Sequence, residues 1–258
     1  MRAHGVRRLT ARVRSIVRRI IRPMAWAGVY ARLEDVPARG GFEDDYWIRA
    51  TRERTQDAME RPPGTGDFVP LVTIAGSLAR DHAPIRILDL GGGMGVAYLE
   101  LRRSLGPDAP IQHVVVELPR VAEAGRALYP GDRRISFVSD LPTGGFEIVH
   151  ACGVLQYASE PFDLLRRLLG YGAPFVVMSN LPAGRIPRYA TAQLNMTGSV
   201  VPCWMFDLDE LEGAVRDLGY VVRSRSWSEM SLIHTYRTRD IPAAHRPERM
   251  VSLLLTPP

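Results

Sequence analysis

The sequence predicts an α/β fold in which a mostly parallel sheet carries helices on both faces. Two observations predict it. From residue 85 onward, apolar runs of strand length alternate with segments that have helical apolar spacing. The first run, Ile85–Leu90, leads into a glycine-spaced turn at residues 91–95, and helical spacing follows over Val96–Leu105. Such a strand, turn and helix place backbone N–H groups where a polar ligand can bind.

The later elements continue this alternation. Strands are expected at Gln112–Val116, at Ile135–Val138, from Phe146, at Pro174–Ser179, at Tyr220–Trp227 and at Met250–Leu255, and helices at Phe162–Leu169 and Leu208–Leu218. The chain has 258 residues, 46% of them hydrophobic, which suffices for one core around a seven-stranded sheet that ends in an antiparallel hairpin. We expect an arm at 1–23, an N-terminal helical or lid segment at 24–83 and a ligand-binding domain at 84–258, with a long loop at about 180–206.

Acidic residues stand at the ends of the first two strands of this domain. Asp89 stands two residues before Gly91, where a carboxylate can accept a hydrogen bond from an ammonium group directly or through water. Glu117 follows the next strand, at the position where such sheets bind a ribose. A dinucleotide-binding turn needs a third glycine where Val96 stands, so the spacing disfavours NAD.

The G-x-G-x-G turn with Asp89 before it resembles the first motif of class I S-adenosylmethionine-dependent methyltransferases, which have a Rossmann-like fold. The resemblance implies S-adenosylmethionine as the cofactor. It implies that the cofactor contacts Asp89, Gly91, Gly93, Gly95, Glu117, Leu118, Asp140, Leu141 and Gln156. Asp140 would meet the adenine amino group, although a plain turn residue is the alternative. Gln156 and Tyr157 stand in a segment similar to the fourth motif, where many members have two histidines.

A wider pattern extends the resemblance over roughly residues 25–258. It consists of Trp26–Tyr30, Gly41–Trp47, the glycine turn, and Gln193-x-Asn195 followed by Pro202 and Phe206. This pattern is similar to a family of methyltransferases encoded among bacterial surface-polysaccharide and natural-product genes. The resemblance does not define the substrate, and our interpretation of the chain is O-methylation of a sugar or natural-product hydroxyl. N-methylation of an amino sugar, peptide or small amine stays open, as do two other classes: a nicotinamide-dependent oxidoreductase and a catalytically silent, membrane-associated scaffold.

The acceptor is expected beyond the carboxyl ends of the strands, next to the 180–206 loop. Long loops in compact domains are often functional, so we expect this one to bind the acceptor through Tyr189, Gln193, Asn195 and Trp204. The alternative is a surface excursion with an internal helix at Tyr189–Met196. A base for the reaction would come from His150, Tyr157 or His234, whereas His82 and His113 are expected to be structural.

The first 22 residues contain eight arginines and no acid, with apolar residues at three- and four-residue steps. This spacing predicts a basic amphipathic helix that Pro23 ends. The helix could contact an anionic membrane surface, or pack as a lid on the domain or against a second subunit of a homodimer. Nucleic-acid binding is not expected, because the rest of the chain shows no basic face interleaved with aromatic residues.

Cysteine usage is sparse. Cys152 and Cys203 have no His or Cys at ligand spacing, so neither a metal site nor a disulfide framework is expected. No run reaches the roughly 18 apolar residues of a membrane-spanning helix. We therefore expect a cytoplasmic protein, with a peripheral position at the inner membrane surface if the arm binds lipid.

Overall fold

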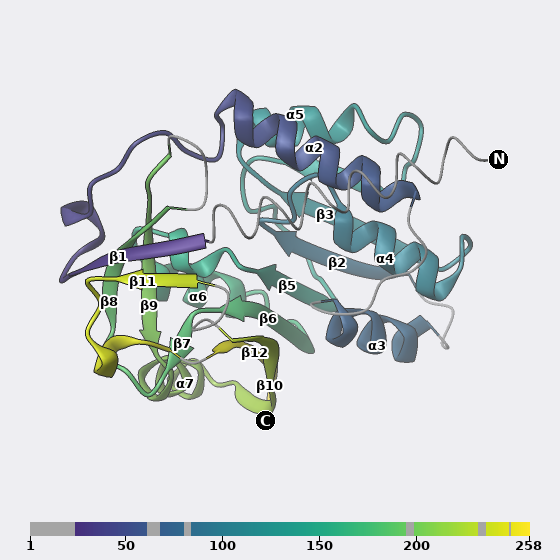
Figure 1. The fold of residues 1–258 in the computed structure, drawn as a ribbon. Helices are drawn as coiled ribbons and strands as arrows, with labels where there is room; N and C mark the ends of the chain where they lie inside the picture. The colour runs from purple at the N-terminus through teal and green to yellow at the C-terminus, as the bar shows by residue number, and fades with distance from the viewer. Residues whose placement is uncertain (1–23, 61–67, 80–83, 195–198, 232–235, 248) are drawn as a thin grey trace.

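The computed structural model describes residues 24–60, 68–79, 84–194, 199–231, 236–247 and 249–258. Two of the sequence candidates, Asn195 and His234, lie outside the described residues, and so does the arm at 1–23. The described chain forms two sheets that lie next to each other, with helices around the larger one (Figure 1).

The larger sheet has seven strands in the order β10-β12-β6-β5-β2-β3-β4. These strands are β2 (Ile85–Leu90), β3 (Ile111–Val116), β4 (Ile135–Val138), β5 (Ile148–Cys152), β6 (Phe175–Leu181), β10 (Val221–Ser231) and β12 (Arg249–Thr256). The neighbouring strands from β4 to β6 are parallel, and β12 runs antiparallel to both β6 and β10. The predicted mostly parallel sheet and its terminal antiparallel pair are confirmed.

Helices cover both faces of this sheet. On one face lie α3 (Val69–Leu78), α4 (Val96–Leu105) and α5 (Pro119–Arg126), and on the other lie α6 (Pro161–Leu169) and α7 (Leu208–Asp217). The alternation within β2 explains the two layers, because Ile87 packs against α3 and α4 while Leu88 packs into the core that α6 and α7 share. The predicted helix at 96–105 and the predicted strands at 85–90 and 135–138 have the observed bounds.

The smaller sheet has the order β11-β1-β8-β9-β7. Its strands are β1 (Met24–Tyr30), β7 (Ala183–Gly184), β8 (Tyr189–Gln193), β9 (Val201–Asp207) and β11 (Tyr236–Arg239). Two expectations were wrong here. The segment 24–83 is helical only in part, since it begins with β1 before α2 (Asp45–Glu60) and α3, and the stretch 180–206 consists largely of strands. Long-range pairing overrides local preference, as in the partnership of Trp26 with Gln193.

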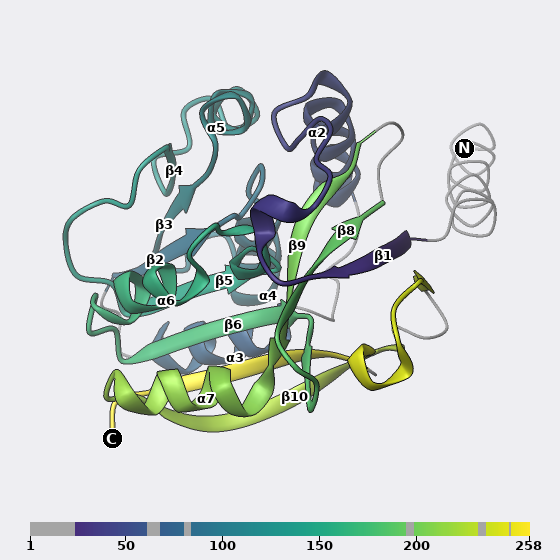
Figure 2. The ribbon, with the colours of Figure 1, turned by 90° about the vertical axis from the view of Figure 1, so that its left-hand side faces the viewer.

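The smaller sheet lies at the carboxyl ends of the parallel strands (Figure 1). Figure 2 shows β8 and β9 crossing the direction of β6. Side chains of β9, including Trp204 and Phe206, enter the core that β5, β6 and β12 share with α6 and α7. Three short 3-10 helices complete the described elements: η1 (Leu33–Asp35), η3 (Leu155–Tyr157) and η4 (Ala243–His245). The smaller sheet therefore forms one wall of the edge where a ligand of such a fold binds.

In the part of the chain that the structure describes, no helix is both long and apolar enough to cross a membrane. The same residues contain no group of three or more His, Cys, Asp or Glu side chains placed to hold a metal ion.

Candidate functional site

The glycine turn joins the end of β2 to the start of α4. Gly91, Gly93 and Gly95 have φ angles of 68°, 60° and 86°, in the left-handed region that favours glycine. Gly95 is the N-cap residue of α4 and has no side chain that could bond the first N–H groups of the helix. The N–H groups of these three glycines already have acceptors within the protein, namely Val116 O, Glu117 Oε1 and Gly92 O. The first N–H groups of α4, which no cap side chain bonds, are the donors that the helix N-terminus can offer to a polar ligand.

Asp89 lies directly beneath this turn. Its side chain is fully buried, with Oδ1 2.7 Å from His150 Nδ1 and Oδ2 3.0 Å from His113 Nε2. Burial opposes ionisation of the carboxyl, but the two imidazoles outweigh it and lower the pKa of Asp89. A Cβ atom at Gly92 would overlap the Asp89 carboxylate, so the turn can lie this close only with glycine there.

These contacts revise two sequence predictions. Both oxygens of Asp89 are bonded to histidines, so the carboxylate supports the turn from below, and the expected direct bond to a ligand ammonium is not favoured. His150 is fully buried, and its Nε2 has no hydrogen-bond partner among the described residues. It therefore acts as a buried partner of Asp89, and its position does not suit the predicted base. His113 is structural, as expected.

Glu117 connects the end of β3 to the glycine turn. Its Oε1 accepts a hydrogen bond from the Gly93 N–H at 3.0 Å, and its Oε2 accepts one from the Leu118 N–H at 2.9 Å. Burial raises the pKa of Glu117, although these two N–H donors oppose the rise. Each carboxylate oxygen keeps a further lone pair, so Glu117 can also accept hydrogen bonds from two vicinal hydroxyl groups.

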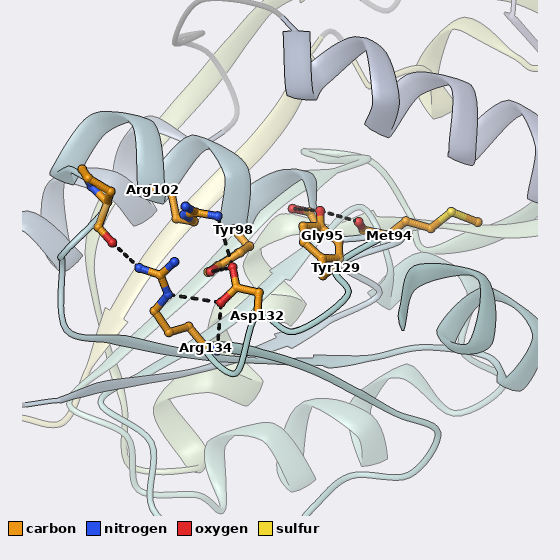
Figure 3. A network of polar contacts seen from close by, with 8 residues as sticks. Met94, Gly95, Tyr98, Arg102, Tyr129, Asp132 and Arg134 are labelled. Carbon is orange, nitrogen blue, oxygen red and sulfur yellow. Dashed lines mark hydrogen bonds and ion pairs between the residues drawn. The ribbon is translucent and has the colours of Figure 1, made fainter. Parts of the chain in front are cut away.

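Tyr129 supports the same turn from the side of α4 and α5 (Figure 3). Its hydroxyl lies 2.9 Å from the carbonyl oxygen of Met94 and 3.2 Å from that of Gly95. Burial raises the pKa of Tyr129, so the hydroxyl stays protonated and able to donate. Next to it, the Tyr98 hydroxyl donates to Asp132 at 2.6 Å (Figure 3). No sequence pattern predicts this support, because Tyr129 follows the turn by more than thirty residues.

Helix α2 approaches the turn from the opposite side. A Cβ atom at Gly93 would lie 3.5 Å from Thr51 Cγ2 and 4.0 Å from the nearest Nη of Arg54. The Arg54 guanidinium also lies over the Trp47 ring at 5.6 Å and interacts electrostatically with Glu117. Sequence reasoning missed Arg54. The available signal was the three-residue spacing of Thr51 and Arg54, which puts both side chains on one helix face.

The start of α2 is fastened to the start of α5. Arg120 Nη2 lies 2.7 Å from Asp45 Oδ1, and the Arg120 backbone N–H donates to Glu43 Oε1 at 3.1 Å. These contacts join the Gly41–Trp47 segment of the sequence pattern to the residues that follow Glu117. They position α2 above the turn.

A second polar group lies at the ends of β5 and β6. Gln156 is 4% exposed, and its Nε2 donates to the Asn180 carbonyl oxygen at 3.4 Å, while its Oε1 has no partner among the described residues. Asn180 has a φ of 55°, unusual outside glycine, and its Nδ2 lies 3.3 Å from Cys152 Sγ. A buried acceptor without a partner is costly, and such a group suits a ligand that donates a hydrogen bond.

Tyr157 stands beside this polar group. Its ring is 4.8 Å from that of Phe42, which is in turn 5.1 Å from the ring of Trp47. The aromatic segment before α2 and the segment after β5 therefore meet at one edge, although more than a hundred residues separate them in the sequence. Tyr157 stays a candidate for contact with the acceptor.

The predicted adenine contacts lie after β3 and β4. Leu118 is 42% exposed, Asp140 is exposed, and Leu141 is half-buried. All three follow strands that end at the same edge as the glycine turn. An exposed leucine with nearby polar groups suits one face of a planar ring.

Two of the predicted acceptor-binding residues in the smaller sheet, Tyr189 and Trp204, have structural contacts. Tyr189 is 2% exposed, and its hydroxyl donates to the His245 carbonyl oxygen at 2.7 Å. Trp204 Nε1 donates to the Ala158 carbonyl oxygen at 3.1 Å, which fastens β9 to the segment after η3. Gln193 is 8% exposed and lies on the same side of β8 as Tyr189. Tyr189 and Trp204 thus have structural contacts in a sheet that the sequence did not reveal, and the contact of Gln193 with the acceptor stays a prediction.

No family model matches the sequence, and no curated protein matches it. Solved structures do resemble it. A magnesium protoporphyrin IX methyltransferase from Synechocystis PCC 6803 with bound SAH has a TM-score of 0.50 at 12% identity, over 83% of this chain and 97% of the other. An S-adenosylmethionine-dependent methyltransferase from Clostridium acetobutylicum ATCC 824 has a TM-score of 0.50 at 10% identity, over 81% and 98%.

The cyclase SpnF is also similar, with a TM-score of 0.51 at 14% identity, over 86% of this chain and 98% of the other. These likenesses show that the chain has the Rossmann-like fold of class I methyltransferases. Because a cyclase shares this fold with methyltransferases, the fold alone does not fix the reaction.

Proposed function

We propose that this protein is an S-adenosylmethionine-dependent methyltransferase. One observation carries the proposal: Glu117, a residue suited to a ribose, bonds the Gly93 amide of the turn that would carry the amino-acid end of the same ligand. Ribose and tail would thus be held by one connected unit. The turn has the G-x-G-x-G spacing with Val96 after it, which favours an adenosyl cofactor over a dinucleotide.

The residues present fit this cofactor. The backbone at Gly91, Gly93 and Gly95 would hold the amino-acid tail, and Arg54 would bind its carboxylate. Glu117 would take the ribose hydroxyls. Leu118, Asp140 and Leu141 would contact the adenine, and Gln156 would close the pocket from the end of β5. When bound, the cofactor supplies an electrophilic methyl group on sulfur.

For the acceptor we propose a hydroxyl group of a sugar or a natural product. Gln156 Oε1 lacks a partner among the described residues and would accept a hydrogen bond from that hydroxyl. Tyr157 and Phe42 would form an apolar wall that excludes water. Methyl transfer depends chiefly on in-line alignment of nucleophile, methyl and sulfur, so positioning by Gln156 and Tyr157 supports the reaction without a strong base. An amine acceptor would use the same hydrogen bond, and product analysis separates the two.

The test begins with calorimetric titration of the full chain with S-adenosylhomocysteine and, separately, with NADH. We expect binding of the first alone. The Glu117→Gln variant should bind it at least about tenfold more weakly, the cost of about one charge-assisted hydrogen bond. Glu123→Gln, an exposed change on α5, serves as the matched control. Binding of NADH alone would overturn the proposal in favour of an oxidoreductase.

A second step tests the acceptor. Panels of hydroxylated saccharides and of amino sugars would be incubated with labelled S-adenosylmethionine, and mass spectrometry would locate the added methyl group. Methylation of oxygen supports the proposal. Methylation confined to nitrogen would correct the acceptor atom, and cofactor binding without any transfer would favour a silent scaffold.

A further inference from the structure

A cavity lies away from the glycine turn, between α7, β7, the middle of β10 and the start of β12. Its volume is about 660 Å³. Val251 of β12 pairs with Leu181 at the end of β6, and β7 follows two residues later, so the cavity opens at the carboxyl edge of the parallel strands. Figure 2 shows α7, β10 and the smaller sheet around this region.

Arginine dominates the polar lining. Four arginines and two carboxylates face the cavity, so positive charge is in excess. Arg225 is already neutralised, because its guanidinium binds both carboxylate oxygens of Glu212, with Nη2 2.5 Å from Oε2. The other carboxylate, Asp209, is exposed at the start of α7.

The three remaining arginines are available to a ligand. Within the described ranges, Arg185 and Arg249 have no ion-pair partner, and both are exposed. Arg246 donates its Nε–H to the Ile241 carbonyl oxygen at 2.8 Å, which directs the guanidinium and leaves its two terminal nitrogens for other acceptors. Like charges gathered around one cavity repel each other, and an anion bound between them would relieve the repulsion.

An aromatic ring completes the lining. Trp227, in the middle of β10, is 47% exposed and is the most exposed large hydrophobic side chain found in the described residues. Its indole takes no part in the hydrophobic cores. An exposed indole beside guanidinium groups can stack on a planar ring, as aromatic side chains do in nucleotide-binding grooves.

We propose that this cavity binds a nucleoside phosphate. The forks of Arg185, Arg246 and Arg249 would bind its phosphate oxygens, because guanidinium groups match phosphate geometry with paired hydrogen bonds. Trp227 would stack on the base. Nothing in the cofactor site described above requires this cavity, whose lining shares no residue with the glycine turn.

The position of the cavity relates it to the proposed reaction. Three strand spacings separate β2 from β12 in the sheet, or about 14 Å at about 4.8 Å for each spacing. A nucleotide-linked acceptor could therefore place its phosphates in the cavity and its methyl-accepting group beside Gln156. This assignment of the ligand as the acceptor rests on the proposed function, whereas the binding site itself does not.

Calorimetric titration of the full chain tests the site with UDP, ADP, pyrophosphate and uridine at constant ionic strength. We expect a nucleoside diphosphate to bind, pyrophosphate to bind more weakly and uridine not to bind. Replacing Arg185 and Arg249 together by Gln should weaken diphosphate binding by at least about tenfold. Trp227→Leu should weaken UDP or ADP binding but leave pyrophosphate binding unchanged.

Arg223→Gln is the matched control, because Arg223 is an exposed arginine of the same strand and does not line the cavity. Equal losses in the control and in the double variant would overturn the site, and so would uridine binding as well as UDP. S-adenosylhomocysteine is titrated in parallel. We expect the double variant to bind it normally, so loss of diphosphate binding can be told from failure of the methyltransferase proposal.

Discussion

The carboxylate of Asp89 is bonded to the imidazole of His150 at 2.7 Å, within the sheet and below the glycine turn. A second imidazole, that of His113, holds the other oxygen. The acid of the first motif is thus a buried structural unit that joins β2 to both of its neighbouring strands, β3 and β5. The shape of the turn depends on this unit, because Gly92 lies against the carboxylate.

Replacing Asp89 by Ala should destabilise the whole protein. Two buried imidazoles would lose their partner, and breaking a buried ionic group of this kind costs about 3–5 kcal/mol. Urea unfolding measures the loss. Asp163→Ala is the control, since that residue forms an exposed pair with Arg166 and its removal should leave the unfolding midpoint nearly unchanged. Equal midpoints for the two variants would show that Asp89 is not structural.

Cofactor affinity should depend on pH through Glu117. Burial raises the pKa of this residue above its ordinary value of 4.5, so it takes up a proton at a higher pH than an exposed Glu. The ionised form is the better hydrogen-bond acceptor. Affinity for S-adenosylhomocysteine should therefore be full above the raised pKa and fall as the pH drops through it. A series of titrations at decreasing pH should show this fall, and its persistence in Glu117→Gln would assign it to another group.

Tyr129→Phe should loosen the glycine turn. The change removes a hydroxyl that lies within hydrogen-bond distance of the Met94 and Gly95 carbonyl oxygens. We expect a loss of about 1 kcal/mol in stability and a several-fold weaker affinity for S-adenosylhomocysteine. Tyr220→Phe is the matched control. The Tyr220 hydroxyl also donates to a backbone carbonyl oxygen, that of Ala173, but it lies away from the turn. The control should lose stability but keep its affinity, and an equal loss of affinity in both would remove the special role of Tyr129.

Arg54→Gln should affect one part of the cofactor. If Arg54 binds the carboxylate of the amino-acid tail, the variant should bind S-adenosylhomocysteine about tenfold more weakly. Its affinity for 5′-methylthioadenosine, which lacks that tail, should be unchanged. Arg52→Gln, on an exposed position of the same helix, is the control. A parallel loss for both ligands would mean that Arg54 acts through the position of α2 and not through the carboxylate.

Deleting residues 1–22 tests the basic arm. The proposed membrane contact predicts that the shortened chain loses association with vesicles that contain anionic lipid, in a salt-dependent manner. Its affinity for S-adenosylhomocysteine should stay close to that of the full chain. Co-sedimentation measures the first property and calorimetry the second. Unchanged vesicle binding would favour the lid or the dimer contact.

The central strands could be predicted because each is a short apolar run with a clear end. Ile85–Leu90 stops at the glycine turn and Ile135–Val138 stops at polar turn residues, so their bounds follow from local sequence. The smaller sheet could not be predicted in this way. The strand Tyr189–Gln193 contains two alanines, which have low strand preference, and it forms through pairing with residues at least 160 positions earlier.

The residues of the candidate site also differ in whether local sequence predicts them. The glycine turn and Glu117 are visible in the sequence because one motif and one strand end place them. The partners of Asp89 are not visible in the sequence, because His150 lies 61 residues away and contacts Asp89 only through strand pairing. Arg54 and Asn180 come from elements whose contact with the turn and with Gln156 depends on tertiary packing.

The position of β12 has a consequence for biosynthesis. This strand inserts between β6 and β10. In the sequence it comes after all the other strands of the larger sheet. While the polypeptide emerges from the ribosome, β6 therefore has an unpaired edge until residues 249–256 become available. Such an edge is a template for intermolecular pairing. A nascent chain stalled before that point should thus be an aggregation-prone species, and chaperone protection would matter most during that interval.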